Sequence, residues 1–101
     1  MNGRLETGAA APDEGEYTEL LVRGDGFTVE QILSGRLDAP RDYEQDHDEW
    51  VVVLAGGAEL EVDGVAHQLT AGDWWLLPAG TRHRLVRTEP GTSWLAVRST
   101  S

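Results

Sequence analysis

The chain has 101 residues, of which 40% are hydrophobic, and this is typical of one small globular domain rather than of a disordered polymer. Eight basic residues, all arginine, stand against 18 acidic ones, so the formal net charge is −10 at pH 7. This charge disfavours nucleic acids and anionic membrane surfaces as partners. The absence of cysteine and lysine excludes disulfides, thiol catalysis and amine nucleophiles, and it fits a cytoplasmic location.

Residues 1–15 are rich in glycine, alanine and acidic residues, and we expect them to form a flexible N-terminal arm. Short alternating or β-branched segments then follow one another along the chain, with glycine-containing turns between them. No segment keeps a helical period long enough to predict a helix. Strands are predicted at residues 17–22, 27–34, 49–54, 58–62, 65–69, 73–77, 83–88 and 93–98. Seven or eight such strands predict an all-β sandwich or barrel.

The segment DYEQDHDEWVVVLAG, residues 42–56, crowds acidic side chains around one histidine directly before an apolar strand. Two interpretations stay open: a solvated acidic loop, or the rim of a metal site. His47 and Glu49 lie two residues apart, so they share one face if the backbone is extended.

The segment GDWWLLPAGTRHRLVR resembles the second sequence motif of the cupin superfamily, G-x5-P-x-G-x2-H-x3-N. Gly72, Pro78, Gly80 and His83 fall at the required offsets. Arg87 stands where the family usually has asparagine.

The first cupin motif, H-x-H-x3–4-E-x6-G, is half present. Glu49 and Gly56 match its second half. With the longer spacing, Asp42 and Glu44 stand at the two histidine positions, so the half that usually binds metal is replaced by acids.

The resemblance covers roughly residues 25–98, and it implies a single-domain jelly-roll β-barrel over residues 16–101 with a site inside the barrel. Cupins include dioxygenases, isomerases, decarboxylases, sugar-binding modules and storage proteins. The fold alone does not choose among these activities.

A divalent metal in such a barrel (Fe, Mn, Ni or Zn) needs three or four converging nitrogen or oxygen ligands. The set His47, Glu49 and His83 would suit non-heme Fe(II). The set Glu44, Glu49 and His83 is richer in oxygen and would favour Mn or Mg. The sequence leaves both sets open.

Three further residues are candidates for ligand binding: Arg87, Asp42 and His67. By a period of two, Arg87 shares a face with His83. Arg87 would then form an ion pair, bind a ligand carboxylate through two hydrogen bonds, or be exposed to solvent at the mouth of the barrel. A two-residue turn at residues 63–64 would place His67 opposite Leu60, either as a core residue or as a ligand contact.

The tryptophans indicate a covered outer surface. Trp74 and Trp75 are adjacent, so one of them must leave the barrel interior, and Trp50 lies on the face opposite Glu49. An outward tryptophan in an all-β domain is most simply covered by a second subunit, so a homodimer is expected.

The sequence therefore predicts a small cupin of unassigned activity that binds a divalent metal, a small polar molecule, or both, in the barrel pocket. A metal-free module for a sugar or metabolite and a structural dimeric barrel remain alternatives.

Overall fold

The structure is a computed structural model that describes residues 1–100. In this part of the chain there are nine strands and one 3-10 helical turn, η1 (Gly8–Ala10). No helix in it is long and apolar enough to span a bilayer. The predicted all-β fold is confirmed.

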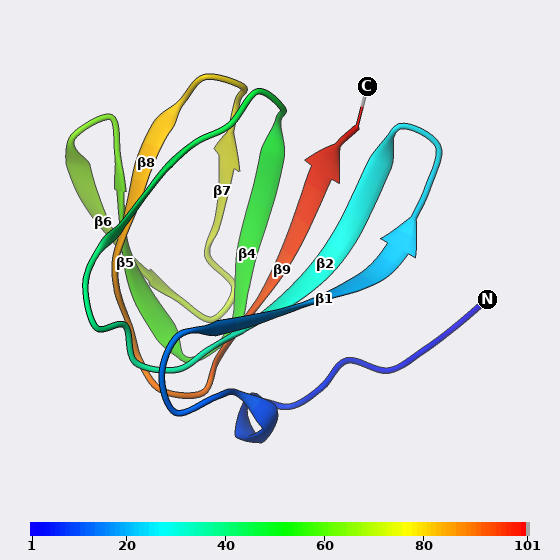
Figure 1. Cartoon of the computed structure of the whole chain (residues 1–101), viewed down its shortest axis with the longest axis horizontal. Helices are drawn as coiled ribbons and strands as arrows, with labels where there is room; N and C mark the ends of the chain where they lie inside the picture. The colour runs from blue at the N-terminus through cyan, green and yellow to red at the C-terminus, as the bar shows by residue number, and fades with distance from the viewer. Residues whose placement is uncertain (101) are drawn as a thin grey trace.

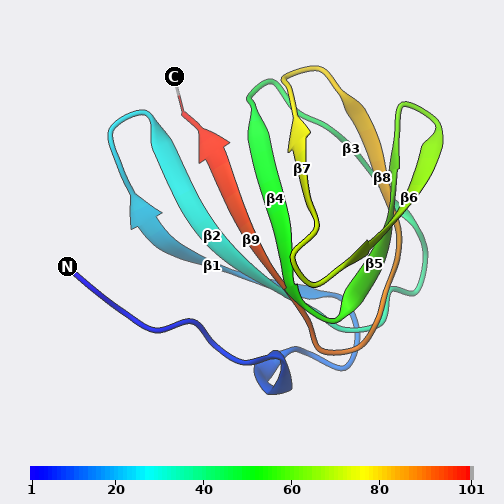
Figure 2. The same cartoon turned by 180° about the vertical axis from the view of Figure 1, so that it is seen from behind.

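Two antiparallel sheets face each other across the core, and they meet at one end and spread apart at the other (Figures 1 and 2). The larger sheet has the order β1-β2-β9-β4-β7, built from β1 (Glu16–Arg23), β2 (Phe27–Ser34), β9 (Thr92–Ser99), β4 (Glu49–Ala55) and β7 (Trp74–Leu77). The smaller sheet has the order β3-β8-β5-β6, built from β3 (Arg41–Glu44), β8 (Arg82–Thr88), β5 (Gly57–Val62) and β6 (Val65–Thr70).

The core forms because apolar residues recur at every second position of the strands that face each other. In β4 these are Val51 and Val53, and in β5 they are Ala58, Leu60 and Val62, all of them buried. Apolar burial of this kind is the main stabilising term of the fold. The intervening side chains point to the outer faces.

Strand β3 is the one strand that the sequence did not predict. Its four residues, Arg-Asp-Tyr-Glu, carry only one aromatic ring, and the last three of them begin the acidic segment. The strand exists because it pairs with β8 over its whole length, from Arg41↔Leu85 to Glu44↔Arg82. Pairing with β8, rather than the strand propensity of its own residues, therefore determines that β3 forms.

The hairpin between β5 and β6 is confirmed in its predicted register. Asp63 and Gly64 both have positive φ, 48° and 84°, as a two-residue primed turn requires. Leu60 therefore lies opposite His67, and Val62 opposite Val65.

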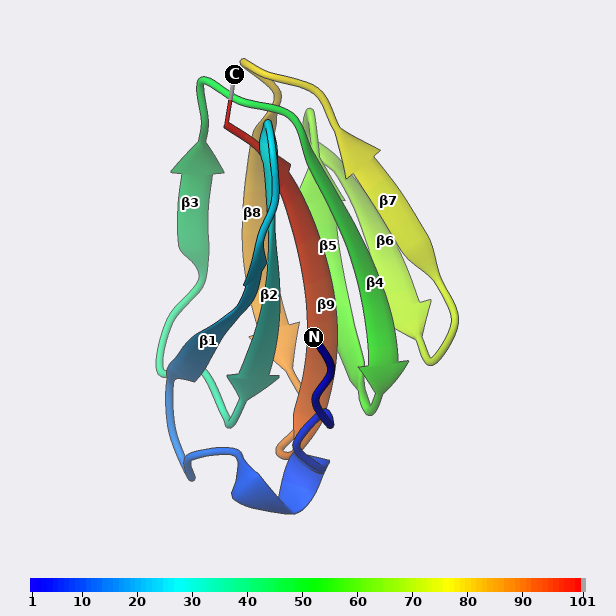
Figure 3. The same cartoon turned by 90° about the vertical axis from the view of Figure 1, so that its right-hand side faces the viewer.

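The N-terminal arm crosses the outer side of the larger sheet, where the backbone of Glu6 is hydrogen-bonded to Gln31 (Figure 3). The Glu6 N–H donates to Gln31 Oε1 at 3.0 Å, and Gln31 Nε2 donates to the Glu6 carbonyl at 2.9 Å. A parallel bridge between Glu14 and Arg36 holds the end of the arm. Gln31 is thereby buried although it lies on the outer face.

Candidate functional site

A cavity of about 170 Å³ lies between the two sheets and is lined by side chains from both. Its apolar wall comes from the core, and polar side chains from both sheets complete its lining. The polar residues are Glu16, Thr18, Glu30, Tyr43, Gln45, Glu49, His83 and Arg98; the apolar ones are Ile32, Val51, Leu60, Leu77, Leu85 and Trp94.

Glu49 and His83, the two cupin-motif residues that can bind a cation, come together in this cavity and are 6% and 8% exposed. His83 Nδ1 lies 3.3 Å from the carbonyl oxygen of Thr81. A carbonyl only accepts, so in the neutral ring Nδ1 carries the proton and Nε2 offers a lone pair. The Tyr43 ring stacks on His83, with ring centroids 5.3 Å apart.

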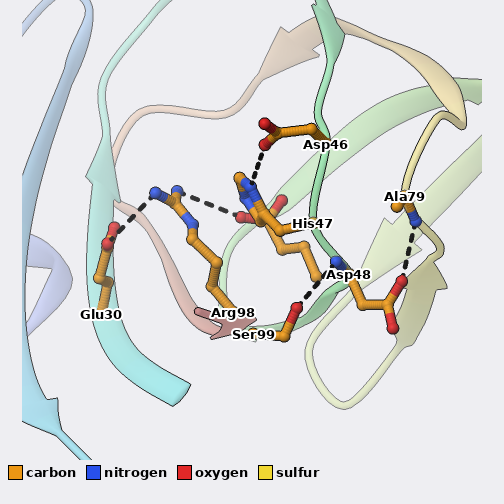
Figure 4. A network of polar contacts seen from close by, with 8 residues as sticks. Glu30, Asp46, His47, Asp48, Ala79, Arg98 and Ser99 are labelled. Carbon is orange, nitrogen blue, oxygen red and sulfur yellow. Dashed lines mark hydrogen bonds and ion pairs between the residues drawn. The ribbon is translucent and has the colours of Figure 1, made fainter. Parts of the chain in front are cut away.

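Arg98, near the end of β9, brings a positive charge into the same cavity (Figure 4). Its Nη2 lies 3.4 Å from Glu49 Oε2, and its Nη1 lies 3.7 Å from Glu30 Oε1. The guanidinium therefore partly neutralises two carboxylates that would otherwise repel each other. With Glu16 included, three carboxylates and one guanidinium line the cavity, so its formal charge is negative.

Tyr43 supplies a neutral phenol. Burial raises the pKa of Tyr43 above 10.0, and the negative charge of Glu16 raises this pKa further, whereas Arg41 acts in the opposite direction. The Glu16 carboxylate is held in place by the hydroxyl of Ser34, which donates to it at 2.5 Å. At neutral pH the Tyr43 hydroxyl is thus a hydrogen-bond donor and not a phenolate.

Two polar atoms of cavity residues are buried without a partner: Oε1 of Gln45 and Nε of Arg98. The first is an acceptor and the second a donor. Buried polar groups are normally paired, so an unpaired acceptor and donor on one cavity mark a place for a ligand or for water.

Strand alternation corrects the alignment of the first cupin motif by one residue. Tyr43 pairs with His83, and both side chains face inward, as Gln45 does two residues later. The shorter motif spacing, H-x-H-x3-E, then places Tyr43 and Gln45 at the two histidine positions before Glu49.

Asp42 and Glu44 point to the outer face of the smaller sheet, where each meets an arginine. Asp42 Oδ1 lies 2.7 Å from Arg84 Nε, and Glu44 Oε2 lies 3.1 Å from Arg82 Nε. A wide groove of about 640 Å³ runs over these pairs. It is larger than the barrel cavity, but its acids and arginines already pair with one another on the surface, so we regard the barrel cavity as the site.

His47 lies in the loop before β4 and does not line the cavity. Its Nδ1 lies 3.2 Å from the exposed carboxylate of Asp46 (Figure 4). The loop itself is ordered by hydrogen bonds: Ala79 N–H donates to Asp48 Oδ1 at 2.9 Å, and the Gly80 N–H donates to the Gln45 carbonyl at 2.7 Å. The turn before His83 therefore positions Gln45.

Arg87 does not share the face of His83, because the pairing of β8 with β5 shifts by one residue between them. Glu59 pairs with Arg87 but Leu60 pairs with Leu85, so the period of two is broken there. Arg87 is exposed, and its Nη2 donates to Gln68 Oε1 at 2.8 Å.

His67 lies on the inner face, as predicted, but outside the residues that line the cavity. Its ring packs on Trp75, with centroids 4.2 Å apart. Trp75 in turn packs against the core, so His67 borders the core at the β6–β7 side.

The donor set does not fit a metal ion. Within residues 1–100 no three His, Asp or Glu side chains lie close enough together to hold one. Tyr43 and Gln45 offer a neutral phenol and an amide where the family motif has imidazoles, and the Glu49 carboxylate is already paired with Arg98. Divalent metals need several carboxylate or imidazole ligands at one point.

Residues 28–97 match the family model described as a cupin domain, which is well over half of the chain. The chain belongs to the cupin family. The resemblance seen in its two motifs is thereby confirmed.

This cupin is similar in structure to a putative mannose-6-phosphate isomerase from Ralstonia eutropha JMP134, with a TM-score of 0.78, 36% identity, and coverage of 91% of this chain and 89% of the other. It also shares its jelly-roll fold with KdgF from Halomonas sp., with a TM-score of 0.75, 22% identity, and coverage of 86% and 80%.

Quercetin 2,3-dioxygenase of Bacillus subtilis (strain 168) is 39% identical over 61 residues, which is 59% of this cupin. This cupin spans only 18% of the length of that enzyme.

Sequence reasoning missed the residue that dominates the electrostatics of the cavity. Arg98 lies two residues beyond Ala96 and four beyond Trp94, on one face of β9, and both of these are buried. The period of two from Trp94 could have placed Arg98 inside the barrel.

Proposed function

We propose that this cupin binds a small, uncharged, hydroxyl-rich molecule in the barrel cavity without a metal ion. One observation carries the proposal: Arg98, a permanent cation, lies between Glu30 and Glu49 while its own Nε and the Oε1 of Gln45 stay unpaired. The protein's own guanidinium thus supplies the positive charge that a metal would otherwise bring to Glu49.

The polar lining of the cavity suits hydroxyl groups, because a hydroxyl both donates and accepts hydrogen bonds. Tyr43 and Arg98 can donate to a ligand, and Gln45, Glu30 and His83 can accept from it. The apolar wall, which includes Trp94, would contact the carbon skeleton. A mainly apolar wall with a few polar side chains is common in small-molecule sites.

The charge and the volume of the cavity restrict the class of ligand that it can bind. Three carboxylates against one arginine disfavour carboxylate or phosphate ligands. A cavity of about 170 Å³ is below the roughly 300–1,000 Å³ typical of pockets for drug-sized ligands. The ligand is therefore expected to have the size of a monosaccharide or a smaller polyol.

A second candidate is a divalent metal site on Glu49 and His83, favoured by their shared cavity. It would require a third ligand and the release of Glu49 from Arg98. Metal analysis of protein purified without chelator separates the two candidates. Stoichiometric metal that is lost in His83→Ala would support the metal site and contradict the metal-free proposal.

The metal-free proposal is tested by thermal shift and calorimetry with sugars and sugar alcohols, their sugar-acid analogues, and divalent metals. We expect neutral polyols to raise the midpoint of unfolding, with or without EDTA, because specific binding stabilises the folded state. Acid analogues should give smaller shifts. Shifts with acid analogues or metals alone, or with none of the panel, would contradict the proposal.

Two variants locate the binding. Gln45→Ala and His83→Ala each remove one expected hydrogen bond and should weaken binding about tenfold. Arg84→Ala is the matched control, since Arg84 neighbours His83 but points to the outer face and pairs with Asp42. Equal affinity in all three variants would place the ligand elsewhere.

A further inference from the structure

The far edge of β7 is a strand edge without charged side chains. β7 is the last strand of the larger sheet, and β1, β3 and β6 are the other edge strands of the two sheets (Figure 2). Three of the eight residues of β1 and three of the four residues of β3 are charged, whereas β6 and β7 contain no Asp, Glu, Lys or Arg. Charged side chains commonly protect a strand edge against pairing with another chain. The edges of β6 and β7 lack this protection.

The register between β4 and β7 shows which backbone groups of β7 face this edge. Val53 N–H donates to the Asp73 carbonyl at 3.0 Å, which continues the pairing of the two strands by one residue. In an antiparallel ladder every second residue bonds to the neighbouring strand, so Trp75, two residues on, also bonds to β4. The N–H and C=O groups of Trp74 and Leu76 therefore point away from β4, to a side where the described chain has no further strand.

The side chains around β7 favour it over β6 as the edge that accepts an apolar strand. Trp74 and Leu76 are 60% and 53% exposed on the outer face, and the Trp74 ring lies 6.2 Å from that of Trp50, centroid to centroid. A strand added beside β7 would bury part of this apolar surface. Beside β6, in contrast, Gln68 donates to the Glu59 carboxylate at 2.6 Å, so an apolar strand would cover polar groups there.

We propose that the free edge of β7 binds an extended segment of another protein as an added antiparallel strand. N–H and C=O groups that recur at every second residue match the backbone of another extended polypeptide, and strand addition is a common mode of peptide recognition. Residues that lie opposite each other in a sheet have their side chains on the same face. The residues of the segment opposite Trp74 and Leu76 therefore point outward, and apolar side chains at these positions contact both.

The intervening side chains of the added strand point to the inner side of the edge. There the half-buried rings of Trp75 and His67 pack on each other with centroids 4.2 Å apart. The two rings fill much of this space, so small side chains such as threonine suit the inner positions of the segment.

The charges around β7 restrict the class of partner. Asp73 directly precedes β7, and the Asp48 carboxylate accepts from Ala79 N–H at 2.9 Å just after the strand ends. These two carboxylates attract Lys or Arg at both ends of a bound segment. A second copy of the chain, with its net charge of −10, would instead be repelled. The expected segment is therefore apolar at alternate positions and basic at both ends.

Amide hydrogen exchange of the whole chain with a defined peptide tests the proposal. The probe is the peptide KVTVTVK, blocked at both ends, whose valines can lie opposite Trp74 and Leu76. We expect the peptide to slow exchange at the Trp74 and Leu76 amides at least about tenfold, because both become hydrogen-bonded. The Trp75 amide, already bonded to β4, should exchange slowly with and without peptide. The peptide EVTVTVE should bind more weakly, because its ends are repelled by Asp73 and Asp48.

Backbone methylation separates strand addition from attraction between charges. Antiparallel addition directs the valine N–H groups of KVTVTVK toward β7 and the threonine N–H groups away from it. N-methylation of the valines should therefore abolish binding, whereas N-methylation of the threonines, at the same charge, should leave it nearly unchanged. Equal binding of the two methylated peptides would overturn the proposal.

Two variants locate the peptide on β7. Leu76→Pro removes an N–H group that makes no bond to β4, and edge strands tolerate proline, so KVTVTVK should bind this variant at least about tenfold more weakly. Ala66→Pro is the matched control. It removes an N–H group from the free edge of β6, since Val65 is the residue that pairs with Val62 across the turn, and it should leave binding unchanged.

Three further results would also overturn the proposal. The first is unchanged exchange at Trp74 and Leu76 of the wild-type chain with excess KVTVTVK. The second is full affinity in a folded Leu76→Pro variant. The third is slow exchange at Trp74 and Leu76 without peptide that depends on protein concentration, because a second copy would then occupy the edge. The methylated peptides are tested on the wild-type chain, so the test does not depend on the folding of either variant.

Discussion

Tyr43 is the cavity residue whose ionisation should make the stability of the fold depend on pH. Its phenol is held neutral by burial and by Glu16, so the pKa of Tyr43 in the folded state lies above 10.0. The unfolded chain loses this proton near pH 10 and the folded chain loses it at higher pH. Between these two values the folded state binds more protons, so stability falls as the pH rises.

Replacement of Tyr43 by phenylalanine should therefore flatten the loss of stability that begins as the pH rises through about 10. Urea unfolding at several pH values in this range measures the effect. Tyr17→Phe is the matched control, since Tyr17 is the other tyrosine and lies exposed on β1, and this variant should keep the wild-type profile. Equal pH profiles for wild type and Tyr43→Phe would show that the phenol has no such role.

At the scale of elements, the hairpin between β5 and β6 fixes which side chains enter the core. Gly64 has φ of +84° with no atom near the position of a Cβ, so Gly64→Ala meets only the backbone cost of that conformation. We expect a loss of about 1 kcal/mol in the free energy of unfolding, measured by denaturant titration. Gly3→Ala, which has neither positive φ nor a close neighbour, should change nothing. A neutral Gly64→Ala would contradict the primed turn.

The same scale shows what the sequence could and could not predict. Strand β5 was predictable because its apolar residues alternate, and β4 because it is a short run of β-branched and aromatic residues. Strand β3 was missed because a four-residue strand without alternation is defined by its pairing with β8. The register shift in the β5–β8 pairing, which turns Arg87 outward, could not be predicted either. It depends on how the two strands pair and not on the sequence of either one.

Some residues of the candidate site could be predicted from the sequence and others could not. Glu49 and His83 follow rigid motif spacings, and both reach the cavity. The spacing of the first motif can be read with three or four intervening residues, and the two spacings differ by one residue. Because side chains alternate along a strand, one spacing turns Tyr43 and Gln45 inward and the other turns Asp42 and Glu44 inward. Glu30 and Arg98 are 68 residues apart in the chain, and their contact depends on tertiary structure alone.

At the scale of the whole molecule, Gln31 joins the arm to the barrel. Its side chain accepts from and donates to the backbone of Glu6, and it also donates to Ser93 Oγ at 3.0 Å. Gln31→Ala removes these bonds and should release the arm. Hydrogen exchange at the Glu6 amide should then become faster, and stability should fall by about 1–3 kcal/mol.

Gln68→Ala is the control for the arm, because Gln68 is an exposed glutamine on the opposite sheet that bonds to Glu59. Unchanged exchange at Glu6 in Gln31→Ala would mean that other contacts, such as the bridge between Glu14 and Arg36, suffice to hold the arm.

The strand at the centre of the larger sheet, β9, comes after all its sheet partners in the described part of the chain. During synthesis β2 can pair with β1, and β4 with β7, but the edges of β2 and β4 that face β9 must stay unpaired until residues 92–99 are made. The β5–β6 hairpin needs no such delay, since its strands are joined by two residues. We expect the nascent chain to expose the unpaired edges of β2 and β4 until residues 92–99 have been made, which makes this interval the one most open to aggregation and to chaperones.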